Sequence, residues 1–175
     1  MEEIRIDVKK QTPEEMEMGR RQAQTLFKFN HTMPGTDEYV ALMHELFPDM
    51  GEGSIVNTPL TGVRFNAVKI GERVTVMPGC LMMSAGTITL EDDVRIAANV
   101  QLISNNHDLD NRDIITCKPV RICRNAWIGA GATILPGVTV GENAVIGAGS
   151  VVTRSIPPYS VAVGNPCRVI KTIKE

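Results

Sequence analysis

The most regular pattern in this chain is an aliphatic residue at every sixth position in its second half. Six such residues follow one another without a break: Ile122, Ile128, Ile134, Val140, Ile146 and Val152. Two shorter runs keep the same period earlier in the chain: Ile70-Val76-Met82 and Leu90-Ile96-Leu102, separated by a two-residue slip near Gly86. This period is typical of a hexapeptide parallel β-helix, in which three short strands make one coil of about 18 residues.

Two further features keep this six-residue period. Three positions after the aliphatic residues stand residues that accept a positive φ, as the corner of a coil requires: Asn125, Gly131, Gly137, Asn143 and Gly149. Two positions before them stand mostly small residues, which suit a narrow interior: Ala126, Ala132, Val138, Ala144 and Ser150. A β-sandwich would alternate with period two, and βαβ crossovers would need intervening helices, so neither fits this pattern.

The chain divides into three parts that belong to one structural domain. Residues 1–54 are predicted to be helical, because Thr12-Pro13-Glu14-Glu15 forms a capping box that opens a helix running to about Phe29. A second helix is predicted to begin near Thr36, with an apolar stripe at Tyr39, Met43, Leu46 and Phe47. The β-helix is predicted over residues 55–157. Residues 158–175, from Pro158 on, are predicted to leave it and to cap its last coil.

One polar segment, residues 104–113, interrupts the repeat. It cannot fill an aliphatic interior, so it is predicted to project as a loop, and loops held by rigid scaffolds often carry function. The segment contains His107, which is the only histidine of the repeat region. Imidazole is well suited to accept a proton near neutral pH, so His107 is the candidate general base. His31 and His44 lie in the helical part and are interpreted as surface or packing residues.

Composition narrows the possible functions. The chain has 175 residues, of which 43% are hydrophobic, and a formal net charge of −2, which argues against nucleic acid as a partner. No apolar run approaches the roughly 20 residues of a membrane span, and the charged N-terminus lacks a secretion signal, so we expect no membrane partner and a cytoplasmic location. The cysteines show no zinc-finger spacing and are interpreted as reduced thiols, with no metal expected: Cys80, Cys117, Cys123 and Cys167.

Several motifs together resemble a known family. They are the hexapeptide run, the Asn106-His107 segment, Trp127-Ile128-Gly129, the ending Gly164-Asn165-Pro166-Cys167-Arg168-Val169-Ile170, and Phe29-Asn30-His31. This combination resembles the left-handed β-helix acyltransferases of the maltose and galactoside O-acetyltransferase group. The resemblance implies a mainly β fold, a left-handed parallel β-helix of hexapeptide repeats with an N-terminal α-helical segment. It also implies a homotrimer with active sites between subunits, and direct transfer from acetyl-CoA to a hydroxyl, usually of a sugar.

The resemblance also assigns roles to residues. His107 matches the catalytic histidine, which takes the proton of the attacking hydroxyl. The backbone N–H of Ala130 is a candidate donor to the developing oxyanion. The residues expected to bind acetyl-CoA are Trp127, Gly129, Ala130, Gly147, Ala148, Thr153, Arg154, Arg168 and Lys171. Within this set the small residues suit the pantetheine arm, and the guanidinium groups suit the phosphates.

The positions expected to contact the acceptor depart from the family pattern. Met77 stands where members often carry Asn, and Met83-Ser84-Ala85 replaces a turn that is often acidic. Asn106, Met77 and Ala85 are the candidate acceptor contacts, and the acceptor is predicted to be less polar than a free sugar. Two alternatives stay open: a non-catalytic scaffold, and transfer to an amine. A zinc enzyme resembling carbonic anhydrase would need three histidines, and the coils supply only His107.

Overall fold

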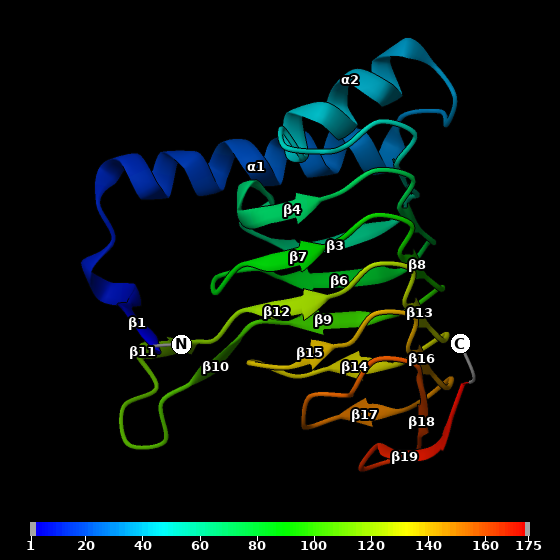
Figure 1. Cartoon of the computed structure of the whole chain (residues 1–175). Coiled ribbons are helices and arrows are strands. Elements are labelled where there is room, and N and C mark those ends of the chain that lie inside the picture. The colour runs from blue at the N-terminus through cyan, green and yellow to red at the C-terminus, as the bar shows by residue number, and fades with distance from the viewer. Residues whose placement is uncertain (1–2, 174–175) are drawn as a thin grey trace.

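The chain winds into a parallel β-helix that carries one strand per coil on each of three faces, with two helices at one end (Figure 1). The computed structural model describes residues 3–173. One face is a seven-stranded sheet of β2 (Ile55–Val56), β5 (Thr75–Val76), β8 (Arg95–Ile96), β13 (Trp127–Ile128), β16 (Val145–Ile146), β18 (Ser160–Val163) and β19 (Arg168–Thr172).

The other two faces are fully parallel. A five-stranded sheet contains β3 (Leu60–Val63), β6 (Cys80–Met83), β9 (Gln101–Ile103), β14 (Thr133–Ile134) and β17 (Val151–Val152). A four-stranded sheet contains β4 (Val68–Ile70), β7 (Ile88–Leu90), β12 (Val120–Ile122) and β15 (Thr139–Val140). The predicted fold is confirmed: the protein is a mainly β, left-handed hexapeptide β-helix with an N-terminal helical segment.

The interior matches the six-residue pattern. All six aliphatic residues of the unbroken run are fully buried, and the small residues two positions before them line the same core. The predicted corner residues have positive φ angles, from 54° at Asn125 to 82° at Gly137. The aliphatic and small positions of the repeat therefore fill the core, and the Gly or Asn position turns the chain.

The end of the β-helix differs from the prediction. The sequence placed it at residue 157, but β18 pairs in parallel with β16 and so belongs to one more coil. Pro157 and Pro158 do not lead the chain away. They pack against Gly141 at a corner, where a Cβ would lie within 2.4 Å of Pro158 N. In the C-terminal segment β19 runs antiparallel along β18, and the capping role of this segment stays a prediction.

The two predicted helices are confirmed and are fastened to the first coil. Helix α1 (Pro13–His31) opens with the predicted capping box and extends two residues beyond Phe29, and α2 (Asp37–Leu46) has Thr36 as its N-cap. Asn30 exchanges two hydrogen bonds of 2.8 Å with the backbone of Leu60. Tyr39 donates to the carbonyl of Val56 at 2.9 Å. Within residues 3–173 neither helix combines the length and apolarity that a membrane crossing requires.

The segment predicted as a loop is a β-hairpin. β10 (Asn105–His107) pairs antiparallel with β11 (Ile114–Cys117), and β1 (Ile4–Asp7) pairs with the other edge of β11. Residues 1–54 are therefore not helical throughout, because they also contain β1 and the short 3-10 helix η1 (Val8–Lys10). A second 3-10 turn, η2 (Phe65–Ala67), follows β3. The interruption of the repeat is thus a small, hydrogen-bonded sheet on the side of the β-helix.

Two glycines provide a matched test of the corner conformation. A Cβ added at either position would meet no atom within 4 Å, but Gly131 has a φ of +67° whereas Gly19 lies inside α1. Gly131→Ala is expected to lower the free energy of unfolding by about 1–2 kcal/mol, because an L side chain strains the left-handed region. Gly19→Ala is expected to raise it by up to about 1 kcal/mol. Urea unfolding at equal protein concentration measures both, and equal effects would contradict the assigned corner.

Candidate active site

The hairpin directs its residues to two faces. Successive side chains of a strand alternate, and directly paired residues share a face. Asn105 and His107 therefore share the face of Ile115, which pairs with His107 across the ladder and with Ile6 of β1. Asn106 lies on the opposite face and is exposed. The strand thus separates Asn106, the predicted acceptor contact, from the face that carries the imidazole.

The His107 ring is oriented by the backbone of its own hairpin. Nδ1 lies 2.7 Å from the carbonyl oxygen of Arg112. A carbonyl only accepts hydrogen bonds, so Nδ1 carries the hydrogen, and in the neutral ring Nε2 has a free lone pair. The group that orients this side chain is a main-chain carbonyl, which no pattern of side chains along the sequence could indicate.

Asp108 organises the turn that supplies this carbonyl. Its carboxylate accepts hydrogen bonds from the amides of Asp110 and Asn111, both at 2.9 Å, and from the Arg5 guanidinium at 2.6 Å. The Asn111 amide first, and then the Arg5 guanidinium and the Asp110 amide, lower the pKa of Asp108 to about 2. A second ion pair joins Lys9 to Asp113. The segment before α1 therefore holds the hairpin by backbone pairing and by charge.

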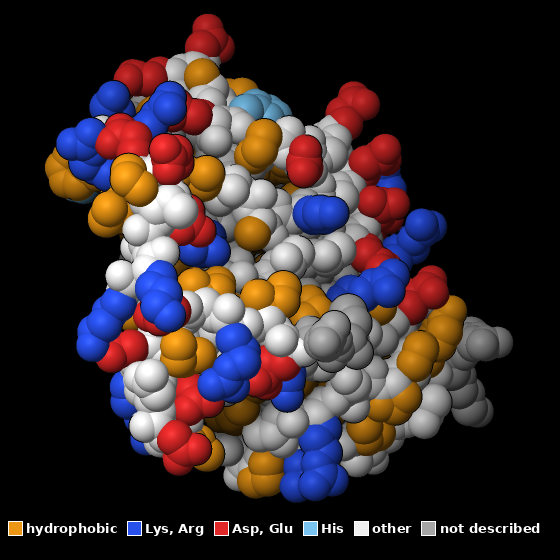
Figure 2. Space-filling view, turned by 90° about the vertical axis from the view of Figure 1, so that its left-hand side faces the viewer, with side chains coloured by type: hydrophobic (Ala, Val, Ile, Leu, Met, Phe, Trp, Pro, Cys, Tyr) orange, Lys and Arg blue, Asp and Glu red, His pale blue; other side chains and the backbone are white. Residues whose placement is uncertain are grey.

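A groove of about 720 Å³ lies between α1, the first coils and the hairpin. Ile6, Asn105 and Ile115 line it from the three-stranded sheet. His107 shares their face two residues beyond Asn105 along β10, and it is not itself among the residues that line the groove. Helix α1 forms another wall with Met16 and Met18. The remaining walls are residues 62–67, which run from the end of β3 into η2, and Met83 and Ala85 of the second coil. Figure 2 shows the side of the molecule that carries the hairpin, where acidic and basic side chains are intermingled.

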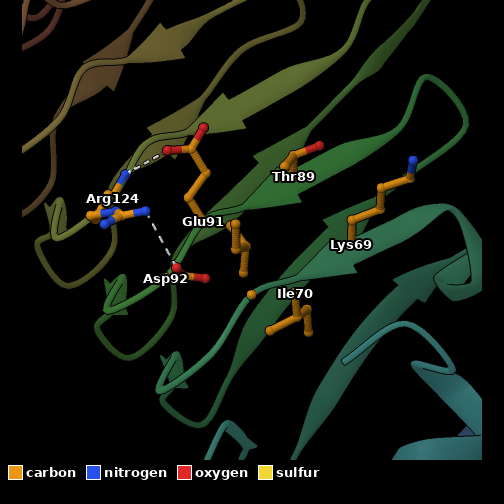
Figure 3. Close-up of a pocket in the computed structure, with 8 residues that line it drawn as sticks. Lys69, Ile70, Thr89, Glu91, Asp92 and Arg124 are labelled. Atoms are coloured by element: carbon orange, nitrogen blue, oxygen red, sulfur yellow. Dashed lines mark hydrogen bonds and ion pairs between the residues drawn. The ribbon is translucent and has the colours of Figure 1, made fainter. Parts of the chain in front are cut away.

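A second hollow, of about 300 Å³, lies on the four-stranded sheet and contains charged residues that satisfy one another (Figure 3). The Arg124 amide donates to Glu91 at 2.9 Å, and its guanidinium lies 3.6 Å from Asp92. Glu91 also binds Arg121. These carboxylates already have cationic partners, so neither of them is free to act as a base in this hollow.

The small residues predicted to bind coenzyme A form one column. Gly129 and Ala130 follow β13, Gly147 and Ala148 follow β16, and both pairs lie at the corner between the seven-stranded and five-stranded sheets. The Gly129 amide donates to Ile146, and that of Gly149 to Ala130, which stacks the two coils. Within the described residues no acceptor pairs with the Ala130 N–H.

Trp127 stands beside this column. Its side chain is 52% exposed and points away from the core, as its place just before an inward aliphatic residue predicts. It pairs in register with Arg95 on one side and Val145 on the other. A large ring that is exposed on a rigid sheet is a feature typical of binding surfaces.

The structure does not bring His107 close to this column within one chain. The hairpin leaves the coil after β9, at the opposite edge of the five-stranded sheet from the corner of Gly129. The strand between these edges, from Val100 to Ser104, spans roughly 13 Å at 3.3 Å per residue. The chain therefore presents the candidate base and the candidate coenzyme residues on two different edges of the prism.

The predicted phosphate-binding residues are divided in the same way. Thr153 and Arg154 follow β17, on the same edge as the hairpin. Arg168 pairs in register with Val163 and Lys171 with Val161, so both belong to β19, the edge strand of the seven-stranded sheet. All four side chains are exposed. One chain thus offers Arg154 on one edge and the pair Arg168 and Lys171 on another.

The predicted acceptor contacts also separate. Ala85 lines the groove, whereas exposed Met77 follows β5 at the corner that carries Gly129. The sequence prediction missed Asn105 and Arg64, which line the groove. Period-two alternation along residues 105–107 is the signal that could have found Asn105, had the segment been predicted as a strand. No signal marked Arg64, because α1 forms the facing wall from far away in the sequence.

Comparison with known proteins agrees with this architecture. Residues 119–154 match the family described as bacterial transferase hexapeptide (six repeats). Galactoside O-acetyltransferase of Escherichia coli is 35% identical over 155 residues, which cover 86% of this chain and 76% of that protein.

Two solved structures are similar over nearly the whole chain. A galactoside acetyltransferase in complex with coenzyme A has a TM-score of 0.90 and 35% identity, and the match covers 94% of this chain and 85% of that one. A maltose O-acetyltransferase from Clostridium difficile has a TM-score of 0.86 and 36% identity, with 91% and 88% covered.

The low pKa of Asp108 predicts how the hairpin responds to acid. Because the pKa of Asp108 is lower in the folded chain than its ordinary 3.8, the ionised carboxylate stabilises the fold fully at pH values above 3.8. This stabilisation is lost as the pH falls through the folded-state pKa of about 2. We expect the turn amides of Asp110 and Asn111 to stay protected from hydrogen exchange down to about pH 4 and to lose protection below it. Asp108→Asn should remove this pH dependence. A carboxyl carbon of Asp108 that titrates near 3.8 in an NMR experiment would contradict the assignment.

Proposed function

Since this chain belongs to the hexapeptide-repeat acetyltransferases, the group of galactoside and maltose O-acetyltransferases, it is an acyltransferase, and we propose that it acetylates a hydroxyl of a small acceptor with His107 as general base. The donor is acetyl-CoA. The acceptor oxygen forms a bond to the acetyl carbonyl carbon, and the bond from that carbon to the coenzyme's sulfur breaks. His107 takes the hydroxyl proton and passes it to the leaving thiolate, so the products are the acetyl ester and free coenzyme A.

The observation that carries this proposal is the hydrogen bond between His107 Nδ1 and the Arg112 carbonyl. It fixes the tautomer in which Nε2 accepts a proton, and it holds the ring on the groove side of the hairpin. The unpartnered N–H of Ala130 within the described residues supports its role as a donor to the developing oxyanion, because such a donor must be free of internal partners.

The coenzyme is proposed to lie along the column of Gly129, Ala130, Gly147 and Ala148. Small residues let the pantetheine arm approach the backbone, and Trp127 beside them offers an exposed apolar surface. Arg168 lies at the C-terminal end of this column and suits a phosphate.

We propose that the enzyme is a homotrimer and that each site needs two subunits. In one chain the five-stranded sheet separates the edge of His107, Thr153 and Arg154 from the edge of Trp127 and Gly129. A second copy that places its column beside the hairpin completes the site and brings together the basic residues of the two edges. Closed, symmetric assemblies are the usual way to join two different surfaces of one chain. The cytoplasmic location stays a prediction.

Substitution of the base tests the mechanism. His107→Ala is expected to lower kcat roughly 10²–10⁴-fold, because general base catalysis contributes that much. Binding of acetyl-CoA, measured by titration calorimetry, should be largely kept, since the histidine contacts the reacting hydroxyl and not the coenzyme's phosphates. His44→Ala, at an exposed histidine of α2, is the matched control and should leave kcat unchanged. Full turnover by His107→Ala would remove the proposed base.

Subunit mixing tests the shared site. Ala148→Glu should block the coenzyme column and inactivate the enzyme, as His107→Ala does on the other edge. Refolded together at equal amounts, the two inactive variants should recover about a quarter of the wild-type activity. A site is intact only when its hairpin comes from the Ala148→Glu chain and its column from the His107→Ala chain, and random mixing gives this combination at one site in about four. No recovery, with mixed oligomers verified by mass spectrometry, would place the whole site within one chain.

A further inference from the structure

The groove between α1 and the hairpin has mostly apolar walls. Its large apolar side chains come from three separate parts of the fold: Met16, Met18, Val63, Phe65, Met83 and Ile115. Val63 is 45% exposed and Met16 56% exposed, so these two side chains face the open groove, whereas Phe65 is buried and joins the groove wall to the core. A sugar needs a hydrogen-bonding partner for each hydroxyl, and these apolar side chains supply none. Of the polar side chains that also line the groove, Gln22 and Asn66 are hydrogen-bonded to each other and Glu15 to the Thr12 amide, which leaves Gln11, Arg64 and Asn105. Contiguous exposed apolar surface on a folded protein points to an apolar ligand.

Arg64 is the only cationic residue among the described residues that line this groove. It is half-buried, and within residues 3–173 no acidic side chain forms an ion pair with it. Glu15, the acid of the groove, accepts a hydrogen bond from the Thr12 amide in the capping box instead. A half-buried guanidinium that has no carboxylate partner favours binding of an anionic ligand, because a planar pair of oxygens can accept two of its hydrogen bonds.

The position of Arg64 relates it to the reacting end of the groove. Arg64 directly follows β3, and β3, β6 and β9 stack in register, so two strand steps of about 4.8 Å separate its coil from the one that leads into the hairpin. Arg64 and Asn105 line the same groove. The anion site is thus expected several bonds away from a hydroxyl held at His107.

Asn105 supplies a polar group between these two points. Its Oδ1 is buried and has no hydrogen-bond partner within the described residues, although the residue lines the groove. A buried amide left unpaired costs free energy, so a ligand group that reaches this oxygen from the groove would gain a hydrogen bond that the folded chain does not supply. Because Asn105 and His107 share one face two residues apart, this amide is placed to hold an acceptor hydroxyl beside the imidazole.

From these observations we propose that the acceptor is an amphipathic hydroxy acid, whose apolar chain lies in the groove, whose carboxylate pairs with Arg64, and whose hydroxyl is held by Asn105. This inference rests on the proposed acetyltransferase function. The hydroxyl oxygen attacks the acetyl carbonyl of acetyl-CoA, the carbon–sulfur bond breaks, and the proton leaves with the thiol. The carboxylate takes no part in the step and only fixes the position of the acceptor.

The test compares a hydroxy acid with its methyl ester, which lacks only the carboxylate charge, and with a sugar. Thiol release from acetyl-CoA is followed with ω-hydroxydecanoate, with its methyl ester, and with methyl galactoside. The wild type should use the acid with a kcat/KM roughly tenfold to a hundredfold above that of the ester, the range expected for one charge-assisted hydrogen-bonded pair. Arg64→Met should remove this preference and change the rate with the ester by less than about threefold. Lys69→Met, at an exposed lysine of β4 outside the groove, is the matched control and should keep the preference.

Three results overturn the inference. They are equal use of acid and ester by the wild type, an unchanged preference in Arg64→Met, and faster turnover of methyl galactoside than of the acid. If the sugar is acetylated in a way that depends on His107, the inference fails while the proposed function stands. Failure of every acceptor, together with no heat on titration of acetyl-CoA, would reject the function itself. Calorimetric binding of ω-hydroxydecanoate to wild type but not to Arg64→Met would then still support the anion site.

Discussion

The stacking of one coil on the next is the constraint on which the rest of this protein depends. Backbone hydrogen bonds join successive coils at a fixed spacing, for example from the Gly129 N–H to the Ile146 carbonyl and from the Gly147 N–H to the Ala162 carbonyl. The interior between them is narrow, so each inward position accepts only an aliphatic or a small residue. Corners must then recur at fixed intervals in the left-handed region. A chain built in this way can carry chemistry only on its outer faces and at interruptions.

The single long interruption is where the candidate base lies, and it is more rigid than a loop. Its two strands pair with each other and with β1, and Asp108 ties the turn together through backbone amides and Arg5. The main chain of this turn then orients the His107 ring. A catalytic group held by backbone bonds keeps its geometry more accurately than one on a free loop, which general base catalysis requires.

The helical segment has two roles. Its buried face closes the open end of the β-helix, where Phe29 and Tyr39 pack on each other with ring centres 4.6 Å apart. The N-terminal half of α1 instead lies over the first coils and forms one wall of the groove with Met16 and Met18. The same helix therefore stabilises the fold and shapes the space beside the base. Acceptor preference can change with substitutions in α1 while the β-helix stays the same.

The sequence by itself determined the features that depend on local geometry. The period of six, the corner residues such as Asn125, and the capping box at Thr12 each reflect what a few neighbouring residues can do, and all are confirmed. The sequence also singled out His107, because it stands where the period breaks. Only the tertiary structure decided that this break is a hairpin paired with β1, and that β18 adds one more coil. Only it placed Arg64 and Asn105 in one groove and kept His107 apart from Trp127. These relations join segments that are distant in the chain, and the coiling of the backbone, not the local pattern, sets which of them meet.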